Sequence, residues 1–320
     1  MTEADHALSK ILRYTNIRSA TRAEGEETVQ VITRAGPNAV ALETTLLTHG
    51  VPRETAAPLA AQLADIVRKH DVQPVLVGIL DGRAIVGMDE HELARLLAAE
   101  HIVKVNTANL GVVLHRGVAG STTVSATMEL CAHAGVRLFA TGGIGGLHRG
   151  YGTRLDVSSD LAALARFPVA VVCSGAKAML DVPATREALE GLGVPVVGFG
   201  TDRFPAFYLR DGGAGVDEVF DDHADLAAYI AEELARSRRG VLVVNPVPAE
   251  AEISRDDWER WIEQATDQTR RESGRSLTPA VLRKLHEVSD GRTLDANLAL
   301  ARANAELAAS VCRAMLDGSM

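Results

Sequence analysis

The chain has 320 residues, of which 47% are hydrophobic and 23% are charged, and this composition is typical of a soluble globular enzyme. Its length allows one large α/β domain or two small ones. The formal net charge of −9 argues against a surface whose main task is to bind polyanions such as nucleic acids.

Cysteine content and the N-terminal sequence indicate the cellular compartment. Cys131, Cys173 and Cys312 are odd in number and show no CxxC spacing, so no disulfide framework is expected. Residues 1–26 lack the apolar stretch of a signal peptide, and no later segment is long and apolar enough to span a bilayer. We therefore expect a cytoplasmic protein with no nucleic-acid or membrane partner.

Regular hydrophobic patterning begins at Val29, and residues 1–27 are expected to form an N-terminal arm. Apolar runs predict buried strands at residues 39–47, 74–80, 102–105, 136–140, 169–173, 194–199 and 240–245. Helical spacing predicts helices over residues 53–70, 88–100, 123–134, 159–166, 185–192 and 222–237. Asp81-Gly82 predicts a hairpin turn, and Asp89 is a candidate N-cap. This alternation predicts the α/β class, with a mainly parallel sheet covered by helices on both faces.

The C-terminal region, residues 249–320, has a helical pattern almost throughout. Helices are predicted over residues 250–272, 278–288 and 294–316, and the first of them is highly charged. No linker rich in glycine, proline or serine separates this region from the rest. We expect one catalytic domain over residues 28–320, with the helical region wrapping the sheet or mediating oligomer contacts.

Lys177 interrupts the apolar run 169–181, which is predicted to be a buried strand that breaks at Ser174-Gly175 and restarts as a helix. An ammonium group at such a break is costly to desolvate unless it has a partner or a function. A neutral lysine amine is a nucleophile toward carbonyl carbons. The position of Lys177 therefore points to imine chemistry.

Two further charged residues interrupt predicted strands. Glu43 is either an edge-strand carboxylate that faces water or a buried general acid whose pKa is raised by apolar surroundings. Lys104 interrupts the run 102–105, and it is either a residue on a solvated strand face, which alternation would allow, or a functional cation.

Residues 142–150 form a glycine-rich segment directly after a predicted strand. Such turns expose backbone N–H groups and suit anions, but this one matches neither a Walker A loop nor a dinucleotide fingerprint. A tight packing turn explains it equally well, although His148 and Arg149 favour an anionic ligand.

Asp156 and Asp160 flank Ser158 and Ser159, and either serine would cap the next helix. The cluster is either a plain N-cap or a site for a hard cation, where a carboxylate completed by waters suits Mg²⁺ or Mn²⁺. Asn245 ends a predicted strand, where open α/β sheets bind ligands. Asn297 and Asn304 share one face of the last helix, and each alone is more often a structural hydrogen-bonding residue.

In chain order these segments resemble the pseudouridine-5′-phosphate glycosidase family, which is also described as indigoidine synthase A-like and includes related C-glycosynthases. The resemblance covers residues 38–310. It is carried by residues 40–43, 48–50, 103–105, 122–124, 140–150, 156–160, 171–177, 201–205, 245–248 and 294–297, with Asn304.

The resemblance implies an enzyme that cleaves and forms the C–C bond between ribose 5-phosphate and uracil. It implies Lys177 as the nucleophile that forms the imine, Glu43 as proton donor and Asp156 as the ligand of one Mn²⁺ or Mg²⁺ per subunit. It also implies a three-layer α/β/α sandwich and a homotrimer. The substrate contacts that we expect are Lys104, Val124, Ser158, Ser159 and Asp160, with His148, Arg149 and Asn297 added to help hold the substrate.

Three departures from the family pattern leave the aglycone open. The stretch after Lys104 reads Asn106-Thr-Ala-Asn109, with no charge, where the family carries a Ser-x-Arg-Asp-type stretch. Gly120-Ser-Thr-Thr-Val124 and Ala303-Asn304 also differ from the usual sequences. The alternative is a C-glycosynthase that attaches ribose 5-phosphate to another acceptor, such as an aromatic natural product.

Overall fold

The computed structural model describes residues 31–152, 155–268 and 277–318. The N-terminal arm expected over residues 1–27 lies outside the described residues, as does the end of the helix predicted over 250–272. None of the described helices is long and apolar enough to cross a membrane.

The strands are, in chain order, β1 (Val31–Thr33), β2 (Ala39–Glu43), β3 (Gln73–Leu80), β4 (Arg83–Val86), β5 (Val103–Val105), β6 (Gly120–Thr122), β7 (Leu138–Ala140), β8 (Leu147–His148), β9 (Ala170–Cys173), β10 (Leu180–Asp181), β11 (Val196–Phe199), β12 (Arg203–Ala206), β13 (Leu209–Gly215), β14 (Glu218–Phe220) and β15 (Val241–Val244).

The helices are α2 (Thr45–His49), α3 (Arg53–Arg68), α4 (Glu90–Ala98), α5 (Leu110–His115), α6 (Val124–Ala134), α7 (Ser159–Arg166), α8 (Val182–Gly191), α9 (His223–Ser237), the 3₁₀ turn η1 (Ala249–Ala251), α10 (Arg255–Gln268), α11 (Leu277–Val288) and α12 (Arg292–Asp317).

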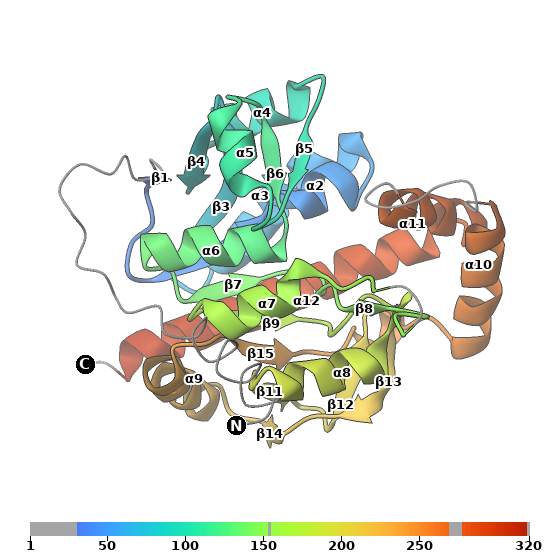
Figure 1. Cartoon of the computed structure of the whole chain (residues 1–320). Coiled ribbons are helices and arrows are strands. Elements are labelled where there is room, and N and C mark those ends of the chain that lie inside the picture. Colours follow the sequence, from blue (N-terminus) through green and yellow to red (C-terminus); the bar gives the residue numbers. More distant parts are fainter. Residues whose placement is uncertain (1–30, 153–154, 269–276, 319–320) are drawn as a thin grey trace, which may run out of the picture. The chain divides into compact units, whose positions relative to one another are not determined.

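Within the described residues, most strands join one 11-stranded sheet in the order β1-β4-β3-β2-β7-β9-β15-β11-β14, with β6 pairing with β3 and β5 with β6. The run from β3 to β14 is parallel throughout. The long helix α12 packs between α3 and α9, while α6 and α7 pack together on the other face of the sheet (Figure 1). This arrangement confirms the predicted three-layer α/β sandwich.

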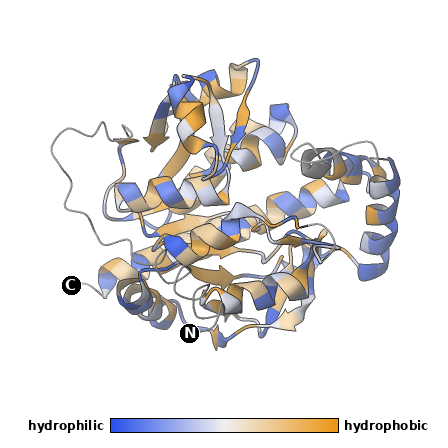
Figure 2. Ribbon diagram, in the orientation of Figure 1, coloured by the Kyte–Doolittle hydropathy of each residue, from blue (hydrophilic) through white to orange (hydrophobic). Residues whose placement is uncertain are grey.

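The core lies where the strands meet the helices. The central strands β7, β9 and β15 are buried along their whole length, as parallel strands covered on both faces must be. Figure 2 shows hydrophobic residues concentrated along the sheet, whereas α10 is largely hydrophilic. That helix attaches through the buried side chains of Trp258, Trp261 and Ala265, which agrees with the charged character expected of this segment.

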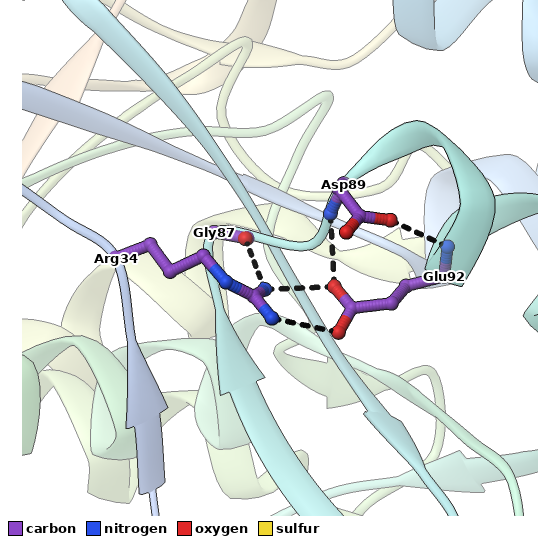
Figure 3. A network of polar contacts seen from close by, with 4 residues as sticks. All are labelled: Arg34, Gly87, Asp89 and Glu92. Atoms are coloured by element: carbon purple, nitrogen blue, oxygen red, sulfur yellow. Dashed lines mark hydrogen bonds and ion pairs between the residues drawn. The ribbon is translucent and has the colours of Figure 1, made fainter.

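The turn and the helix cap predicted in the first third of the chain are both confirmed. The hairpin at Asp81-Gly82 is confirmed, because β3 pairs antiparallel with β4 and both turn residues have positive φ. Asp89 caps α4 in a capping box with Glu92. Figure 3 shows how Arg34 extends this cap, since its guanidinium donates to both carboxylate oxygens of Glu92 and to the carbonyl of Gly87. The cap thereby ties β1 to the end of β4.

Two boundaries differ from the predictions. The strand expected over residues 39–47 ends at Glu43, and the chain turns at once into α2. The helix expected directly after Ser174-Gly175 is absent, because residues up to Met179 form a loop, Leu180–Asp181 forms β10 and α8 begins only at Val182. Both differences place polar side chains in loops at the same edge of the sheet.

Candidate active site

The predicted catalytic residues come together at the carboxyl ends of the central parallel strands. Glu43 is the last residue of β2, Thr141 directly follows β7, and Lys177 lies in the loop after β9. Lys104 lies within β5, which joins the sheet by pairing with β6, and β6 in turn pairs with β3. Open α/β sheets bind ligands at this edge.

Glu43 is held in an apolar setting. Strand β2 pairs with β3 on one side and β7 on the other, so the alternative of an edge-strand carboxylate is wrong. The Thr141 hydroxyl donates a hydrogen bond to Oε1 of Glu43. Burial raises the pKa of the Glu43 carboxyl, and the nearby positive charge of Lys177 and the bond from Thr141 offset this only in part. A carboxyl of this kind suits general acid catalysis near neutral pH.

Lys177 is positioned by its backbone, which leaves its side chain free. Its N–H donates to the carbonyl of Ile144 at 3.1 Å, and its own carbonyl accepts from Leu180 N–H at 2.9 Å. Gly175 shapes the approach, because its φ is +72° and an added Cβ would lie 1.9 Å from the carbonyl oxygen of Pro205. The Lys177 ammonium has no hydrogen bond or ion pair within the described part of the chain. It is therefore available to a substrate.

Lys104 is half-buried, so its placement on a fully solvated strand face is wrong. Burial lowers the pKa of its ammonium, and the charge of Lys177 lowers it further, against the opposite effect of Glu43. The uncharged stretch behind it is a self-contained turn, in which Asn109 donates to the Lys104 carbonyl at 3.1 Å and accepts from Asn106 N–H at 2.8 Å. Two lysines beside one carboxyl make a site suited to an anionic ligand.

Two pockets meet at these residues. Glu43, Thr45, Lys104, Lys177 and Met179 line both of them. The first pocket continues along an apolar wall, made by Leu46, Ala178, Phe207, Tyr208 and Trp258, and also contains His49 and Asn297. The second continues along polar groups, which include Asn106, Thr123, His148, Asp156, Ser158, Ser159 and Asp160, together with Val124. We call these the apolar pocket and the polar pocket.

The expected substrate-binding residues lie mostly in the polar pocket. Ser158 is the N-cap of α7, with its hydroxyl accepting from Asp160 N–H at 3.2 Å, and Ser159 lies 2.9 Å from the Ser125 hydroxyl. Asp160 is 4% exposed, and its carboxylate accepts from the N–H groups of Ser125 at 3.0 Å and Gly145 at 2.8 Å. This carboxylate thus joins α6, the glycine-rich loop and α7 where they line the pocket.

Arg149 lies away from the other site residues. It is exposed, and it lines two clefts against α10 and neither of the two pockets described above. His148, its neighbour in sequence, does line the polar pocket and is fixed by its N–H bond to the carbonyl of Asp156 at 3.1 Å. The glycine-rich segment therefore contributes His148 to the site, and Arg149 remains outside it.

Asp156 lines the polar pocket, and its side chain is exposed, so that its carboxylate can bind a ligand there. Its neighbour Asp160 is already bonded through both oxygens, and the described residues contain no group of three or more His, Cys, Asp or Glu arranged to hold a metal. A single carboxylate fits a hard cation that keeps most of its waters and is completed by substrate oxygens. The donor set thus suits Mn²⁺ or Mg²⁺ and not a zinc-type cage.

Asn304 ties three of the strand ends together. It is fully buried, and its amide donates to the Thr141 carbonyl at 2.8 Å and to the Ser174 hydroxyl at 3.1 Å. Its oxygen accepts from Asn245 at 3.1 Å. Asn297, seven residues earlier in α12, donates to the Gly50 carbonyl at 3.1 Å, while its buried Oδ1 has no partner within the described residues.

Several lining residues had no signal in the sequence. Phe207 is an aromatic residue with φ of +59°, and it lies against Gly143, where an added Cβ would come within 2.5 Å of its ring. The rings of Phe207 and Tyr208 pack edge to face with their centroids 4.8 Å apart. The centroids of the Tyr208 and Trp258 rings are 5.5 Å apart. Thr141 lies in the segment 140–150 that carries the family resemblance, but nothing in the sequence indicates its contact with Glu43. Only the fold brings these residues to the pocket.

Residues 28–314 match the family model described as indigoidine synthase A like protein. The chain is 45% identical to a pseudouridine-5′-phosphate glycosidase of Paracoccus denitrificans over 296 residues, which cover 90% of this chain and 96% of that relative. It is 42% identical to a protein of the same name from Caldanaerobacter subterraneus over 276 residues, covering 85% and 90% of the two chains.

Two solved structures share the fold. An indigoidine synthase A-like protein of Thermotoga maritima superposes with a TM-score of 0.84 at 36% identity, covering 91% of this chain and 98% of that one. The prealnumycin C-glycosynthase AlnA, solved in complex with ribulose 5-phosphate, superposes with a TM-score of 0.80 at 29% identity, covering 88% and 94%.

Proposed function

Because the chain belongs to the indigoidine synthase A-like family, we propose that it is a C-glycosidase that cleaves and forms the C–C bond between ribose 5-phosphate and uracil. The observation that carries the proposal is the wall shared by the two pockets. There Glu43, a carboxyl with a raised pKa, and two lysines without an ion pair among the described residues, Lys104 and Lys177, separate a polar pocket from an apolar one. A sugar phosphate suits the polar pocket, and a flat heterocycle suits the apolar pocket.

A C-glycosidic bond needs an electron sink, because direct cleavage would release a poorly stabilised carbanion. In the cleavage direction, the Glu43 carboxyl protonates the ribose ring oxygen as its bond to C1′ breaks, and the amine of Lys177 bonds to C1′. The Glu43 carboxylate then takes a proton from the new ammonium. As the ring carbon of the aglycone gains a proton, its bond to C1′ breaks, and the nitrogen lone pair of Lys177 forms the imine. Water then releases ribose 5-phosphate.

The polar pocket would position the phosphate and hydroxyl groups of the substrate. Lys104 supplies a cation, and Ser158, Ser159 and His148 supply hydrogen-bonding groups at the N-terminus of α7, where the helix dipole favours negative charge. Asp156 would hold Mn²⁺ or Mg²⁺, which supplies a fixed positive charge for the substrate oxygens when bound. Holding C1′ against Lys177 is expected to account for much of the rate.

The decisive assay follows uracil release from pseudouridine 5′-phosphate in the presence of Mn²⁺. Turnover supports the proposal. Borohydride trapping with ribose 5-phosphate alone tests the imine separately, by the mass of an adduct on Lys177. An adduct without any uracil release would show that uracil is not the aglycone, while the imine chemistry would still hold. Light scattering of the purified protein tests the homotrimer that the family resemblance implies.

The second candidate is a C-glycosynthase that takes another acceptor. It is favoured by the aromatic wall of Phe207, Tyr208 and Trp258 and by the uncharged turn from Asn106 to Asn109. The structural relative AlnA, a C-glycosynthase, shares the fold, although its identity to this chain is lower than that of the glycosidases. Formation of a C-riboside 5′-phosphate from ribose 5-phosphate and an aromatic acceptor, with no activity on uracil, would decide in its favour.

A further inference from the structure

His49 lines the apolar pocket and takes no part in the catalytic steps proposed above. It is the last residue of α2, the short helix that follows Glu43, and it is half-buried. It shares the pocket wall with Glu43, Lys104 and Lys177. A titratable ring at this place faces the side where the aglycone is proposed to bind.

The turn that carries His49 is fixed from two directions. An added Cβ on Gly50 would lie 2.8 Å from the carbonyl oxygen of Leu46, so the turn closes tightly on α2. The Gly50 carbonyl accepts from Asn297 at 3.1 Å and forms a second hydrogen bond with the ring of His286. His286 is in turn held by Thr293 at 2.8 Å. The C-terminal helices thus hold the residue directly after His49 in place, and general acid–base groups require such positioning.

Hydrogen bonds at one ring nitrogen indicate the tautomer of His49. Its Nδ1 lies 2.6 Å from the hydroxyl of Thr48 and 3.3 Å from that of Ser121. The Thr48 hydroxyl also lies 3.1 Å from the Thr44 carbonyl, and when its one proton is donated there its oxygen accepts from Nδ1–H. This tautomer leaves Nε2 with a free lone pair.

No hydrogen bond or ion pair engages Nε2 within the described ranges, and Nε2 is not among their fully buried polar atoms without a partner. It is therefore at least partly accessible, in a residue that lines the apolar pocket. Burial lowers the pKa of the imidazole, and the charge of Lys104 lowers it further, which favours the neutral ring that can accept a proton.

We propose that His49 is the general acid–base group that exchanges the proton on the aglycone carbon at which the C–C bond forms and breaks. This inference rests on the proposed function. In the bond-forming direction, an electron pair of the heterocycle joins its ring carbon to C1′ of the protonated Lys177 imine, and the C=N π electron pair moves onto the lysine nitrogen. Nε2 of His49 then takes the proton of that carbon, the C–H electron pair restores the ring, and the imidazolium passes the proton to water. In cleavage, the imidazolium returns a proton to the same carbon.

The test uses the His49→Asn variant, because an asparagine amide can keep the bond that Nδ1 makes to Thr48 but has no group at the place of Nε2. Wild type and variant are each given ribose 5-phosphate with uracil or 5-deuterated uracil, and borohydride adducts are measured in parallel. We expect kcat for bond formation to fall by about 10²- to 10⁴-fold. We also expect an increased isotope effect with deuterated uracil and an unchanged adduct on Lys177. The exposed His133, changed to Asn, is the matched control.

The outcomes separate three cases. A His49→Asn variant whose kcat and isotope effect equal those of wild type would overturn the assignment. Loss of the ribose 5-phosphate adduct in this variant, with the fold intact by thermal melting, would also overturn it, because His49 would then position the imine and not transfer the proton. Absence of the adduct in wild type would instead refute the proposed function, independently of His49.

Discussion

The hydroxyl of Thr141 donates a hydrogen bond to the carboxyl of Glu43, and this contact joins the ends of the neighbouring parallel strands β7 and β2. The Thr141 carbonyl itself accepts a hydrogen bond from the side-chain amide of Asn304 on α12. The position of Glu43, the proposed proton donor, is therefore set by the sheet and by α12 together. Its orientation relative to Lys177 depends on residues from three separate parts of the sequence.

The raised pKa of Glu43 predicts an alkaline limit of activity. Burial raises the pKa of this carboxyl, and a general acid must carry its proton, so kcat/KM should fall as pH rises through the raised pKa. Glu43→Gln should lower kcat by about 10²- to 10⁴-fold and remove that limb of the pH profile. The check is the pH dependence of uracil release. An unchanged alkaline limb in Glu43→Gln would assign the limb to another group.

The same pKa predicts how stability depends on pH. Above the pKa of about 4.3 of an unfolded glutamate, the folded protein keeps a proton on Glu43 that the unfolded chain loses. The free energy of unfolding contributed by this group therefore decreases as pH rises from that value through the raised pKa of the folded state. Glu43→Gln, which cannot ionise, should flatten this part of the stability profile. Thermal unfolding of both proteins between pH 4 and 9 measures the difference.

Sequence patterns predicted the sheet and most helices, because hydrophobic periodicity reports which face of an element is buried. The α7 bounds, the Asp89 cap and the hairpin at Asp81-Gly82 follow from local chemistry alone. The end of β2 does not. Its β-branched neighbours Thr44 and Thr45 favour a strand, but the Thr44 side chain donates to the Val77 carbonyl and accepts from Thr122 N–H, and these tertiary bonds accompany the turn into α2.

The proposed catalytic residues could be predicted from the sequence because charges interrupt apolar strands, whereas the apolar pocket could not. Phe207 and Tyr208 reach it through a loop conformation with positive φ, and no local pattern signals such a residue. Arg149 shows the opposite error. Its place beside a glycine-rich turn suggested a ligand contact, but the turn directs it toward α10.

Lys177 is predicted to be the covalent nucleophile. Lys177→Ala should abolish the borohydride adduct with ribose 5-phosphate and lower turnover by at least about 10⁴-fold, as expected when an enzyme loses its covalent nucleophile. Lys104→Ala is the matched control, because it removes the other unpaired lysine of the pocket wall and should keep a trappable adduct while raising KM. Intact-protein mass spectrometry reads both. An adduct that persists in Lys177→Ala would show that a different lysine reacts.

Asn304 is predicted to hold the strand ends in register. Asn304→Ala leaves buried partners at Thr141, Ser174 and Asn245 without their bonds, so the free energy of unfolding should fall by about 2–4 kcal/mol. Ser310→Ala, on the same helix but partly exposed, should change it by less than about 0.5 kcal/mol. Urea denaturation followed by circular dichroism measures both. Equal stability of the two variants would mean that water replaces the amide of Asn304 without cost.

Asp156 is predicted to hold the divalent cation through one carboxylate. Because this side chain is exposed, Asp156→Asn should leave the melting temperature unchanged. The Mn²⁺ concentration that gives half-maximal activity should rise by at least about tenfold, since even outer-shell partners of a metal contribute that much. Asp221→Asn, an exposed aspartate outside both pockets, serves as control. Wild-type activity should vanish on chelation with EDTA and return with Mn²⁺ or Mg²⁺, and full activity in the chelated enzyme would remove the metal from the reaction.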